Sequence, residues 1–397
     1  MKRVLLATTG LIGAGCVASP AFAADGIKLT VGGFFKEAYM AVFDDDNDGE
    51  LGNERNTDGF FNDAEIHFKG STVLDNGLEV GARVELEGET DTDQIDEAWI
   101  WFSGGFGEVR IGSDDEALAN ACVVPPGGTA NFSAFSPNQW GANDAFLFAF
   151  FGTFSSNSVC AGVDSGSDAQ KILYITPNFS GFQLTLSYTP NGGAETHDDG
   201  AGPHIGMPTH FTFETRHDVS VYGTYTYDGD GWGLTAGLGG SWAGHQEDRG
   251  ISGDVKERDF YQGGINLTLG NFAVGVVGEY FNDAFDVRTS SIRISHDIWT
   301  AGIGAAYTMD AWTLGLQYSH REDDFDFSSS SVDNLHLQQD RVVATANYAL
   351  GPGINVDGEI GYTWADSDPE FSAISSDFGD VDDYDALEIA IGTSLTF

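Results

Sequence analysis

The feature that most constrains the fold is a repeated alternation of apolar and polar residues with a period of two. In residues 78–87 every second position is apolar, and the positions between them carry glycine or charge. The same split recurs in residues 261–269 and 312–319. Successive side chains of a β-strand point to opposite faces, so each segment reads as an amphipathic strand. The alternation predicts an all-β chain.

The connections between these segments are short and long in turn. The short ones, such as residues 74–77 and 228–231, are rich in the Gly, Asn and Asp that tight turns need. The long ones include residues 282–297 and 322–340, and the last segment alternates up to Phe397. Short turns at one rim and long loops at the other are typical of outer-membrane proteins. The sequence predicts a 16-stranded antiparallel transmembrane β-barrel, with a soluble sandwich as the alternative. A barrel of this size encloses an aqueous lumen.

The N-terminus has the order of a secretory signal peptide. Lys2 and Arg3 precede an apolar run over residues 4–17, and Ala21-Phe22-Ala23 follows as a cleavage site. The predicted signal peptide covers residues 1–23, and the predicted barrel domain covers residues 24–397. Cys16 lies in the apolar run, so a lipoprotein cleavage box is the alternative, although the usual aliphatic residue three positions earlier is missing.

The charge of the chain limits its partners. The sequence has 17 basic and 61 acidic residues, a formal net charge of −44. Such an excess of carboxylates argues against nucleic acid as a partner. Solvated acidic loops are the simplest explanation for part of it. No other apolar run reaches the length of a membrane helix.

Residues 113–169 interrupt the alternation for longer than any other stretch. An insert of this length is either functional or disordered, and its many aromatic residues argue against disorder. We expect it to fold inward. Cys122 and Cys160 both lie within it, and in an oxidising compartment they are expected to form a disulfide, with free thiols as the alternative.

Three short motifs resemble the Gram-negative general porins. They are the hairpin at residues 96–112 with its aromatic–Gly–Phe–Gly turn, the Pro-Asn-Phe-x-Gly-Phe turn at residues 177–182, and Ile66-His67-Phe68-Lys69-Gly70. The resemblance implies a homotrimer in outer-membrane lipid and lipopolysaccharide, with the third long loop, residues 113–169, folded into each lumen as a constriction. It also implies passive diffusion of small hydrophilic solutes and ions, with no cofactor required. The chain departs from the family where Gly33, Glu65, Asp96 and Leu173 replace residues that are often basic.

Strand parity, aided by this resemblance, gives a set of candidate pore-lining residues. They are Glu65, Lys69, Glu79, Arg83, Glu85, Asp96, Glu108, Arg110, Asp114, Asp115, Glu116 and Asp144. Carboxylates outnumber cations in this set, which predicts a preference for cations. A substrate-selective porin, for example for sugars, and a surface adhesin on a barrel scaffold are the alternatives. No Ser/His/Asp arrangement stands out, so we do not expect an enzyme.

Two loops carry possible metal ligands. Asp44, Asp46 and Asp48, followed by Gly49, have the spacing that begins a calcium-binding loop, with Glu54 near the place of the last ligand. An acidic surface loop is the alternative, because no helix pattern flanks the motif. Four histidines lie between residues 197 and 217, but their spacing matches no compact zinc pattern.

Overall fold

The computed structural model describes residues 26–44, 57–88, 95–135, 159–160, 169–191, 216–244, 257–288, 293–327, 335–367 and 384–397. Within these residues the chain forms sixteen strands and one short helix, α2 (Ala117–Ala121). The strands are β1 (Lys28–Asp44), β2 (Asp58–Val73), β3 (Glu79–Glu87), β4 (Ala98–Gly104), β5 (Gly107–Ser113), β6 (Gln170–Ile175), β7 (Phe182–Asn191), β8 (Arg216–Asp228), β9 (Trp232–Gly244), β10 (Arg258–Leu269), β11 (Phe272–Arg288), β12 (Arg293–Met309), β13 (Trp312–Phe327), β14 (Leu335–Gly351), β15 (Ile354–Ser367) and β16 (Tyr384–Thr396).

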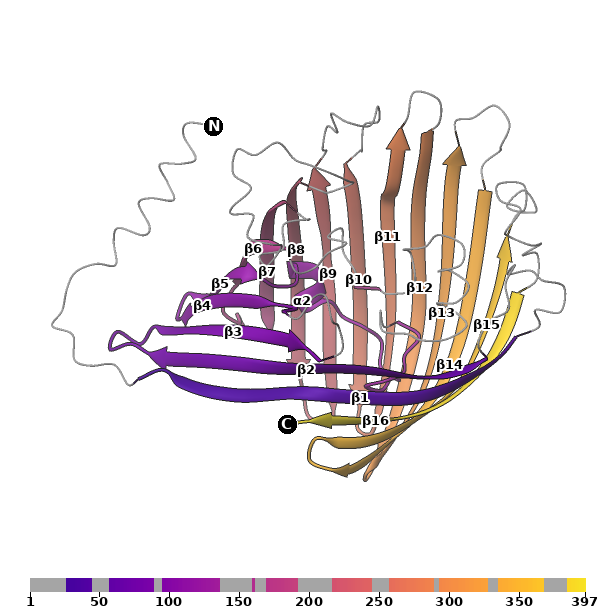
Figure 1. The fold of residues 1–397 in the computed structure, drawn as a ribbon, viewed down its shortest axis with the longest axis horizontal. Coiled ribbons are helices and arrows are strands. Elements are labelled where there is room, and N and C mark those ends of the chain that lie inside the picture. The colour runs from indigo at the N-terminus through magenta and orange to yellow at the C-terminus, as the bar shows by residue number, and fades with distance from the viewer. Residues whose placement is uncertain are drawn as a thin grey trace.

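Each strand pairs antiparallel with the next, and β1 pairs with β16 to close the barrel. The predicted 16-stranded antiparallel barrel is therefore confirmed (Figure 1). Tight turns join the strands at one end, and several use a left-handed glycine, such as Gly231, Gly270 and Gly353. No helix among the described residues is long and apolar enough to cross a membrane.

Two of the predicted loops are wrong in extent. The stretch 282–297 is mostly strand, because β11 continues to Arg288 and β12 begins at Arg293. Likewise β13 continues to Phe327, and β14 begins at Leu335. The sequence hides these extensions because both faces of the strands are polar there, as in His320-Arg321-Glu322-Asp323-Asp324. A strand that rises beyond the lipid has no need of an apolar outer face.

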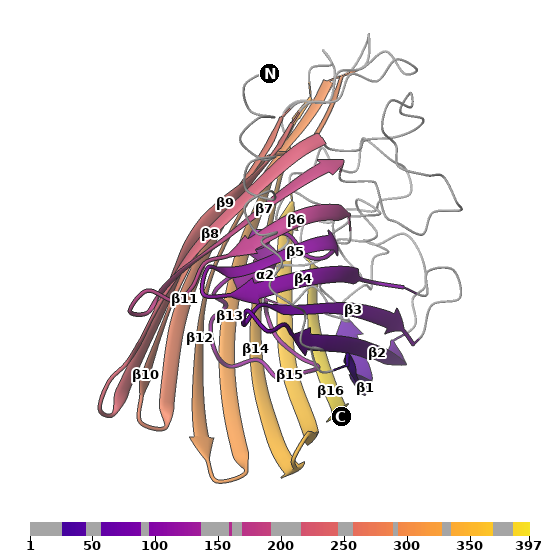
Figure 2. The same cartoon turned by 90° about the vertical axis from the view of Figure 1, so that its left-hand side faces the viewer.

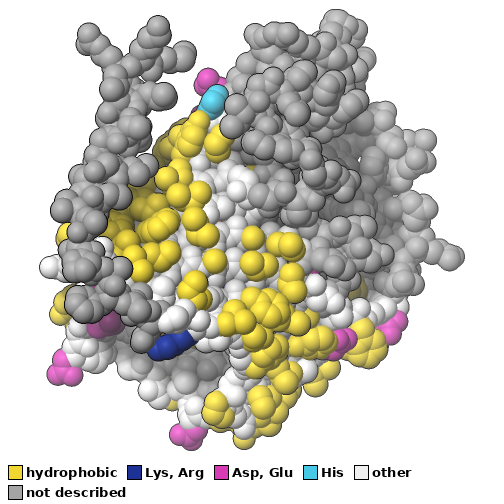
Figure 3. Space-filling model, turned by 60° about the vertical axis from the view of Figure 1, so that its left-hand side comes forward, with side chains coloured by type: hydrophobic (Ala, Val, Ile, Leu, Met, Phe, Trp, Pro, Cys, Tyr) yellow, Lys and Arg dark blue, Asp and Glu magenta, His cyan; other side chains and the backbone are white. Residues whose placement is uncertain are grey.

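The outer face carries an apolar band between two rings of aromatic residues. Outward aliphatic side chains such as Leu238, Ile303 and Ile360 are more than half exposed. Exposed aromatic residues border them on the turn side, namely Phe106, Phe182, Trp232, Phe272 and Trp312. A second ring on the loop side includes Tyr188, Trp242, Tyr261, Tyr280, Tyr318 and Tyr362. Figure 3 shows broad hydrophobic areas on one side of the barrel. This is the surface that a lipid bilayer requires.

The segment after β5 runs along the inside of the barrel. The backbone N–H groups of Ala117 and Leu118 donate to Ser187 Oγ and Ser220 Oγ on β7 and β8. Further along, Gln262 Nε2 on β10 donates to the carbonyl of Val123, and Thr345 Oγ1 on β14 donates to that of Gly127. These strand residues share the face opposite the apolar band. In both ribbon views α2 lies within the ring of strands (Figures 1 and 2).

Glycines on the inner face make room for this segment. A Cβ at Gly264 would lie 2.3 Å from the Val123 carbonyl oxygen, and one at Gly304 would lie 2.0 Å from that of Pro126. A Cβ at Gly315 would lie 1.9 Å from the Gly127 carbonyl oxygen. Side chains of any size at these positions would push the segment away from the wall. We call residues 114–135 the inward segment and this row of glycines the glycine groove.

Candidate pore-lining site

Register assigns the predicted residues of β2 and β3 to the inner face. Lys36 on β1 is paired with Asp63 on β2, and their side chains form an ion pair of 2.6 Å. On β2, Glu65 and Lys69 share the parity of Asp63, whereas Ile66 between them is exposed on the outer face. Glu65 pairs with Glu87 and Lys69 pairs with Arg83, so the odd-numbered residues of β3 also face inward. Glu79, Arg83 and Glu85 belong to this stripe.

His67 lies at the centre of a charged cluster that the sequence did not single out. Its Nε2 lies 2.6 Å from Glu65 Oε2 and 3.0 Å from Glu85 Oε2. Arg83 Nη2 lies 3.0 Å from His67 Nδ1, and Arg83 is also ion-paired with Glu85. Because guanidinium only donates, Nδ1 accepts and Nε2 carries the proton that the two carboxylates share. Parity alone would have placed His67 here, since it lies between Glu65 and Lys69 on the same face.

Asp96 and Glu97 both approach β3 just before β4 begins. The backbone N–H of Asp96 donates to the Glu85 carbonyl, while the Glu85 N–H donates to the Glu97 carbonyl. Two residues thus oppose one, as in a β-bulge, which breaks the simple parity. The carboxylates of Asp96, Glu65 and Glu87 lie within 4.8 Å of one another.

Glu97 is a second acidic residue that sequence reasoning missed. One of its carboxylate oxygens accepts a hydrogen bond of 2.9 Å from the Asp115 N–H. Burial, reinforced by the neighbouring carboxylates Asp114, Asp115, Glu85 and Asp96, raises the pKa of Glu97 to about 9. Glu97 is therefore a neutral acid at pH 7.

The remaining predicted residues divide into partly exposed and buried ones. Arg110 on β5 is ion-paired with Glu108 at 2.7 Å and with Asp114 at 3.1 Å. Asp114 and Glu116 are only 2% and 1% exposed. Their carboxylates are therefore buried, although the sequence predicted that they line the pore. Asp115 lies between them and is half-buried. Asp144 lies outside the described residues.

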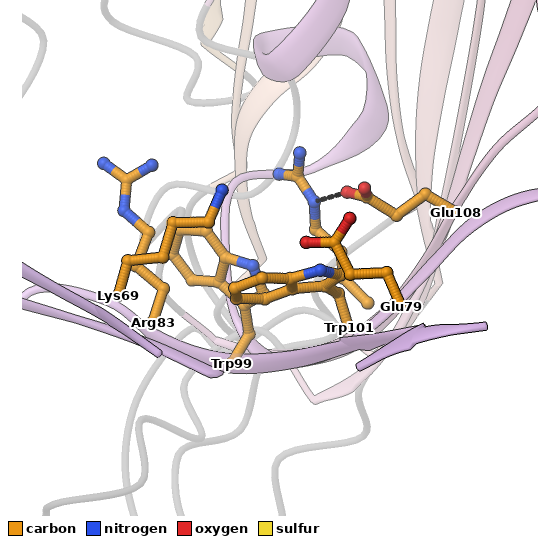
Figure 4. Close-up of a pocket in the computed structure, with 7 residues that line it drawn as sticks. Lys69, Glu79, Arg83, Trp99, Trp101 and Glu108 are labelled. Atoms are coloured by element: carbon orange, nitrogen blue, oxygen red, sulfur yellow. Dashed lines mark hydrogen bonds and ion pairs between the residues drawn. The ribbon is translucent and has the colours of Figure 1, made fainter. Parts of the chain in front are cut away.

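A pocket of about 190 Å³ lies on the inner face of β2 to β5. Its lining consists of Lys69, Glu79, Arg83, Trp99, Trp101, Glu108 and Arg110. Figure 4 shows the two indoles along the wall, with the charged ends of Lys69, Arg83, Glu79 and Glu108 above them. We call β2 to β5 with this pocket the open wall.

The inner face of β12 to β16 also carries charges, but these are covered. Arg341 Nη2 is ion-paired with Glu359 at 2.9 Å and with Glu388 at 2.6 Å, and all three side chains are at most 1% exposed. Arg321 is ion-paired with Asp323 at 2.7 Å, and the Asp323 carboxylate accepts a hydrogen bond of 2.7 Å from His296 Nε2. We call this region the covered wall. The inward segment packs along it, with Ala134 and Phe135 in contact with Val343.

Cys122 and Cys160 form a disulfide that ties the end of α2 to a residue late in the insert.

Among the proposed calcium ligands, Asp44 is the last residue of β1, while Asp46, Asp48 and Glu54 lie outside the described residues. The calcium site stays a prediction that isothermal calorimetry can check. Of the four histidines, His217 is on β8 and its Nδ1 lies 2.7 Å from the Tyr188 hydroxyl; the other three lie outside the described residues.

The comparisons with known proteins agree with this geometry. A sequence model described as Gram-negative porin matches residues 7–368. A protein described as a monosaccharide porin from Halomonas sp and one described as a major outer membrane protein from Halomonas elongata are each 24% identical over 205 residues. Each alignment covers 49% of this chain and 51% of the relative, so the chain spans about half the length of these relatives.

Solved structures are similar in fold over nearly the whole chain. An anion-selective porin from Comamonas acidovorans superposes with a TM-score of 0.58 at 16% identity, covering 94% of this chain and 100% of that one. The trimer form of OmpT, an outer membrane protein of Vibrio cholerae, superposes with a TM-score of 0.56 at 13% identity, again covering 94% and 100%. Identities this low carry an argument for the fold alone.

Proposed function

The chain belongs to the Gram-negative porin family, and from this membership we propose that its lumen is a water-filled, cation-preferring path for passive diffusion of small hydrophilic solutes and ions. The family and the fold point to an outer-membrane channel rather than an enzyme.

The preference for cations is supported by the excess of carboxylates on the open wall. Glu65, Glu87 and Asp96 converge within 4.8 Å of one another. The cations of this wall are mostly engaged, since Arg83 and Arg110 are ion-paired with neighbouring acids. Carboxylates lining a narrow aqueous path attract cations and repel anions. The competing effect is screening, which acts over about 8 Å at physiological salt and would leave a wide pore nearly unselective.

The zero-current potential across a planar bilayer in a potassium chloride gradient tests this proposal. Its sign should show preference for potassium, and Glu65→Arg should reduce the magnitude. The matched control is Glu322→Arg, which makes the same change of charge on the outer face. Glu322 lies on that face, since its carboxylate accepts a hydrogen bond from the outward-facing Trp299 Nε1. A potential that shows chloride preference in the unmodified protein contradicts the proposal.

We also propose that residues 113–169 narrow the lumen. The support is the path of the inward segment along the inner face, together with its tie through Cys122 and Cys160. Reduction of the disulfide should make the single-channel conductance larger or noisier. A conductance trace unchanged after complete reduction, verified by thiol labelling, would show that the tie does not control the narrowing.

A homotrimer is the assembly that we propose, embedded in lipid and lipopolysaccharide. Lys36 faces inward, so its neighbour Glu37 faces outward, beside Asn62 of β2 and Thr393 of β16 in register. A carboxylate and an amide facing lipid are unfavourable, whereas another copy of the chain could cover them. Native mass spectrometry should give the mass of three chains, and a population of monomers alone would count against the trimer.

Sugar permeation is a second candidate, because one relative is described as a monosaccharide porin. Liposome swelling with glucose checks it: a rate above that of a solute of equal size but without the sugar's hydroxyl pattern would favour sugar selectivity.

A further inference from the structure

The pocket on the open wall has an indole floor. Trp99 and Trp101 are two residues apart on β4, and both face inward beside Arg83 and Gly81 in register. A Cβ at Gly81 would lie 2.1 Å from a ring atom of Trp101, so this indole lies flat over the backbone of β3. Trp99 and Trp101 are only 7% and 5% exposed. Little of either ring is left for contact with a solute.

Three cations cover these rings. Lys69 Nζ lies 4.9 Å from the ring centroid of Trp101, while the guanidinium carbons of Arg83 and Arg110 lie 5.1 Å and 5.4 Å from that of Trp99. Such cation–π contacts hold the cations in place. A sugar that binds by stacking would find the indole faces already occupied. The pocket therefore offers its charged ends rather than its rings.

Most of those charges are neutralised within the wall. Arg83 is ion-paired with Glu85, and Arg110 with Glu108. Within the part of the chain that the structure describes, Lys69 Nζ and the Glu79 carboxylate have no ion pair or hydrogen bond with each other or with any other group. Lys69 pairs in register with Arg83, four residues along β3 from Glu79, a backbone distance of about 13 Å. One positive and one negative group thus face the same small pocket from its two sides (Figure 4).

We propose that this pocket is a binding subsite for a compact zwitterion of amino-acid size, whose carboxylate meets Lys69 and whose ammonium meets Glu79. The inference rests on the proposed function, since a subsite in the lumen acts on solutes only if the barrel conducts them. A volume of about 190 Å³ accommodates a solute of this size.

Net charge decides between a zwitterion and a simple ion. An anion would be attracted by Lys69 but repelled by Glu79 and by the carboxylates around Glu65. A cation would be attracted by Glu79 but repelled by Lys69, and it would bind equally well at other acidic positions. A zwitterion has no net charge to be repelled and satisfies both groups at once.

Four solutes of nearly equal size separate these cases: serine, glycerate, serinol and glycerol, which are a zwitterion, an anion, a cation and a neutral molecule. Each is supplied in labelled form to liposomes that contain the purified full-length protein, and initial uptake is measured against concentration. We expect serine uptake to saturate at low concentration and to exceed glycerol uptake. Serine uptake that stays linear and equals that of glycerol would overturn the subsite.

Substitutions at the two charged residues add a second test. Lys69→Met and Glu79→Gln should each raise the serine concentration at half-saturation about tenfold, because each removes one charge-assisted hydrogen bond. A general electrostatic effect would instead leave serine, which has no net charge, unchanged. The double exchange Lys69→Glu with Glu79→Lys should restore part of the saturation, since the zwitterion can bind in the reverse direction. Unchanged serine uptake in either single variant overturns the proposal.

The potassium chloride conductance of each preparation distinguishes failure of the proposed subsite from failure of the proposed channel. Conductance of normal size with unsaturable serine uptake rejects the subsite and leaves the channel standing. Absence of conductance in the unmodified protein rejects the channel itself, and the subsite with it.

Discussion

The open wall and the covered wall are made of the same components in opposite surroundings. In each, one arginine holds two carboxylates: Arg110 with Glu108 and Asp114, and Arg341 with Glu359 and Glu388. The side chains of Arg110 and Glu108 are 21% and 27% exposed, whereas those of Arg341 and Glu388 are 1% and 0% exposed. The inward segment runs along the strands from β7 to β16, where it is bonded to Ser187 and Asp357 and packs against Ala390.

This difference decides what a lumen-facing charge can do. A charge beside water acts on passing solutes, and its own contribution to stability is small. A charge removed from water needs its partner, because an unpaired buried charge is strongly unfavourable. We therefore propose that solutes pass along the open wall, while the charged groups of the covered wall act on stability.

Stability should show the largest contrast between the walls. Arg341→Met leaves Glu359 and Glu388 buried side by side without their cation, and should lower the free energy of unfolding by about 3–5 kcal/mol. The matched change on the open wall, Arg110→Met, should cost less, about 1–2 kcal/mol, because Glu108 is partly exposed to water and Asp114 keeps a hydrogen bond from Asn120 Nδ2. Urea unfolding in lipid vesicles, followed by tryptophan fluorescence, measures both. Equal losses would mean that the two walls do not differ in this way.

The glycine groove gives the next largest effect. Gly315→Ala places a methyl group against the Gly127 carbonyl oxygen and should cost about 1–3 kcal/mol as the inward segment shifts. Gly233→Ala, also on the inner face, is the control, since the nearest atom to its Cβ is 3.4 Å away. The same unfolding assay applies, and single-channel conductance should change only for Gly315→Ala. Equal unfolding free energies and conductances in the two variants would show that the glycine groove does not hold the inward segment in place.

For ion selectivity we expect the opposite contrast, with the larger effect on the open wall and the smaller one on the covered wall. Glu108→Gln removes a partly exposed carboxylate and should lower the ratio of potassium to chloride permeability. Glu388→Gln removes a carboxylate that no solute can reach and should change this ratio less, although it should destabilise the barrel. Zero-current potentials of the two variants in the same salt gradient compare them directly. A larger shift for Glu388→Gln would contradict the division of roles.

The smallest effect is a pH dependence on the open wall. Glu97 has a pKa of about 9 in the folded protein, well above its usual value. Cation preference should therefore rise further as the pH passes 9 and Glu97 ionises. The folded state holds this proton more tightly than the unfolded chain does. Its contribution to stability is present below about pH 4 and is lost as the pH rises towards 9.

Glu97→Gln serves as the control for both parts of this prediction. The variant cannot ionise at this position, so it should lack the rise in cation preference near pH 9. Its unfolding free energy should also fall less between pH 5 and 9. Identical pH profiles in the two proteins would show that Glu97 does not titrate in this range.

Much of the barrel could be predicted because its pattern is local. Residues 78–87 alternate, so the inner and outer faces of β3 follow from covalent geometry alone. The prediction failed where the surroundings of a strand change along its length. The sequence pattern predicts a long loop over residues 322–340, but the structure places Asp323 on β13, fully buried beside Arg321 and His296.

The charged sites were less predictable because they depend on contacts between distant residues. Glu97 required the bulge opposite Glu85, and nothing in the local sequence marks that bulge. Burial of Asp114 and Glu116 depends on where the inward segment lies. The sequence does carry one signal of this packing: the inner positions of β10, β12 and β13 are glycines, Gly264, Gly304 and Gly315, which indicates that another segment packs closely against that wall.

Phe132 has a consequence for how the molecule assembles. Its ring packs against Ala38 and Met40 of β1 and against Ala390 of β16, the two strands whose pairing closes the barrel. Its neighbour Asn131 donates to Asp357, 226 residues further along the chain. The ribosome makes residues 114–135 long before β16, so these contacts must wait for the end of the chain. The inward segment can therefore complete its packing only after β16 has been made and paired with β1. A barrel that closed without the inward segment would keep the backbone pairing of β1 with β16 but would lose the contacts of Phe132 with both strands.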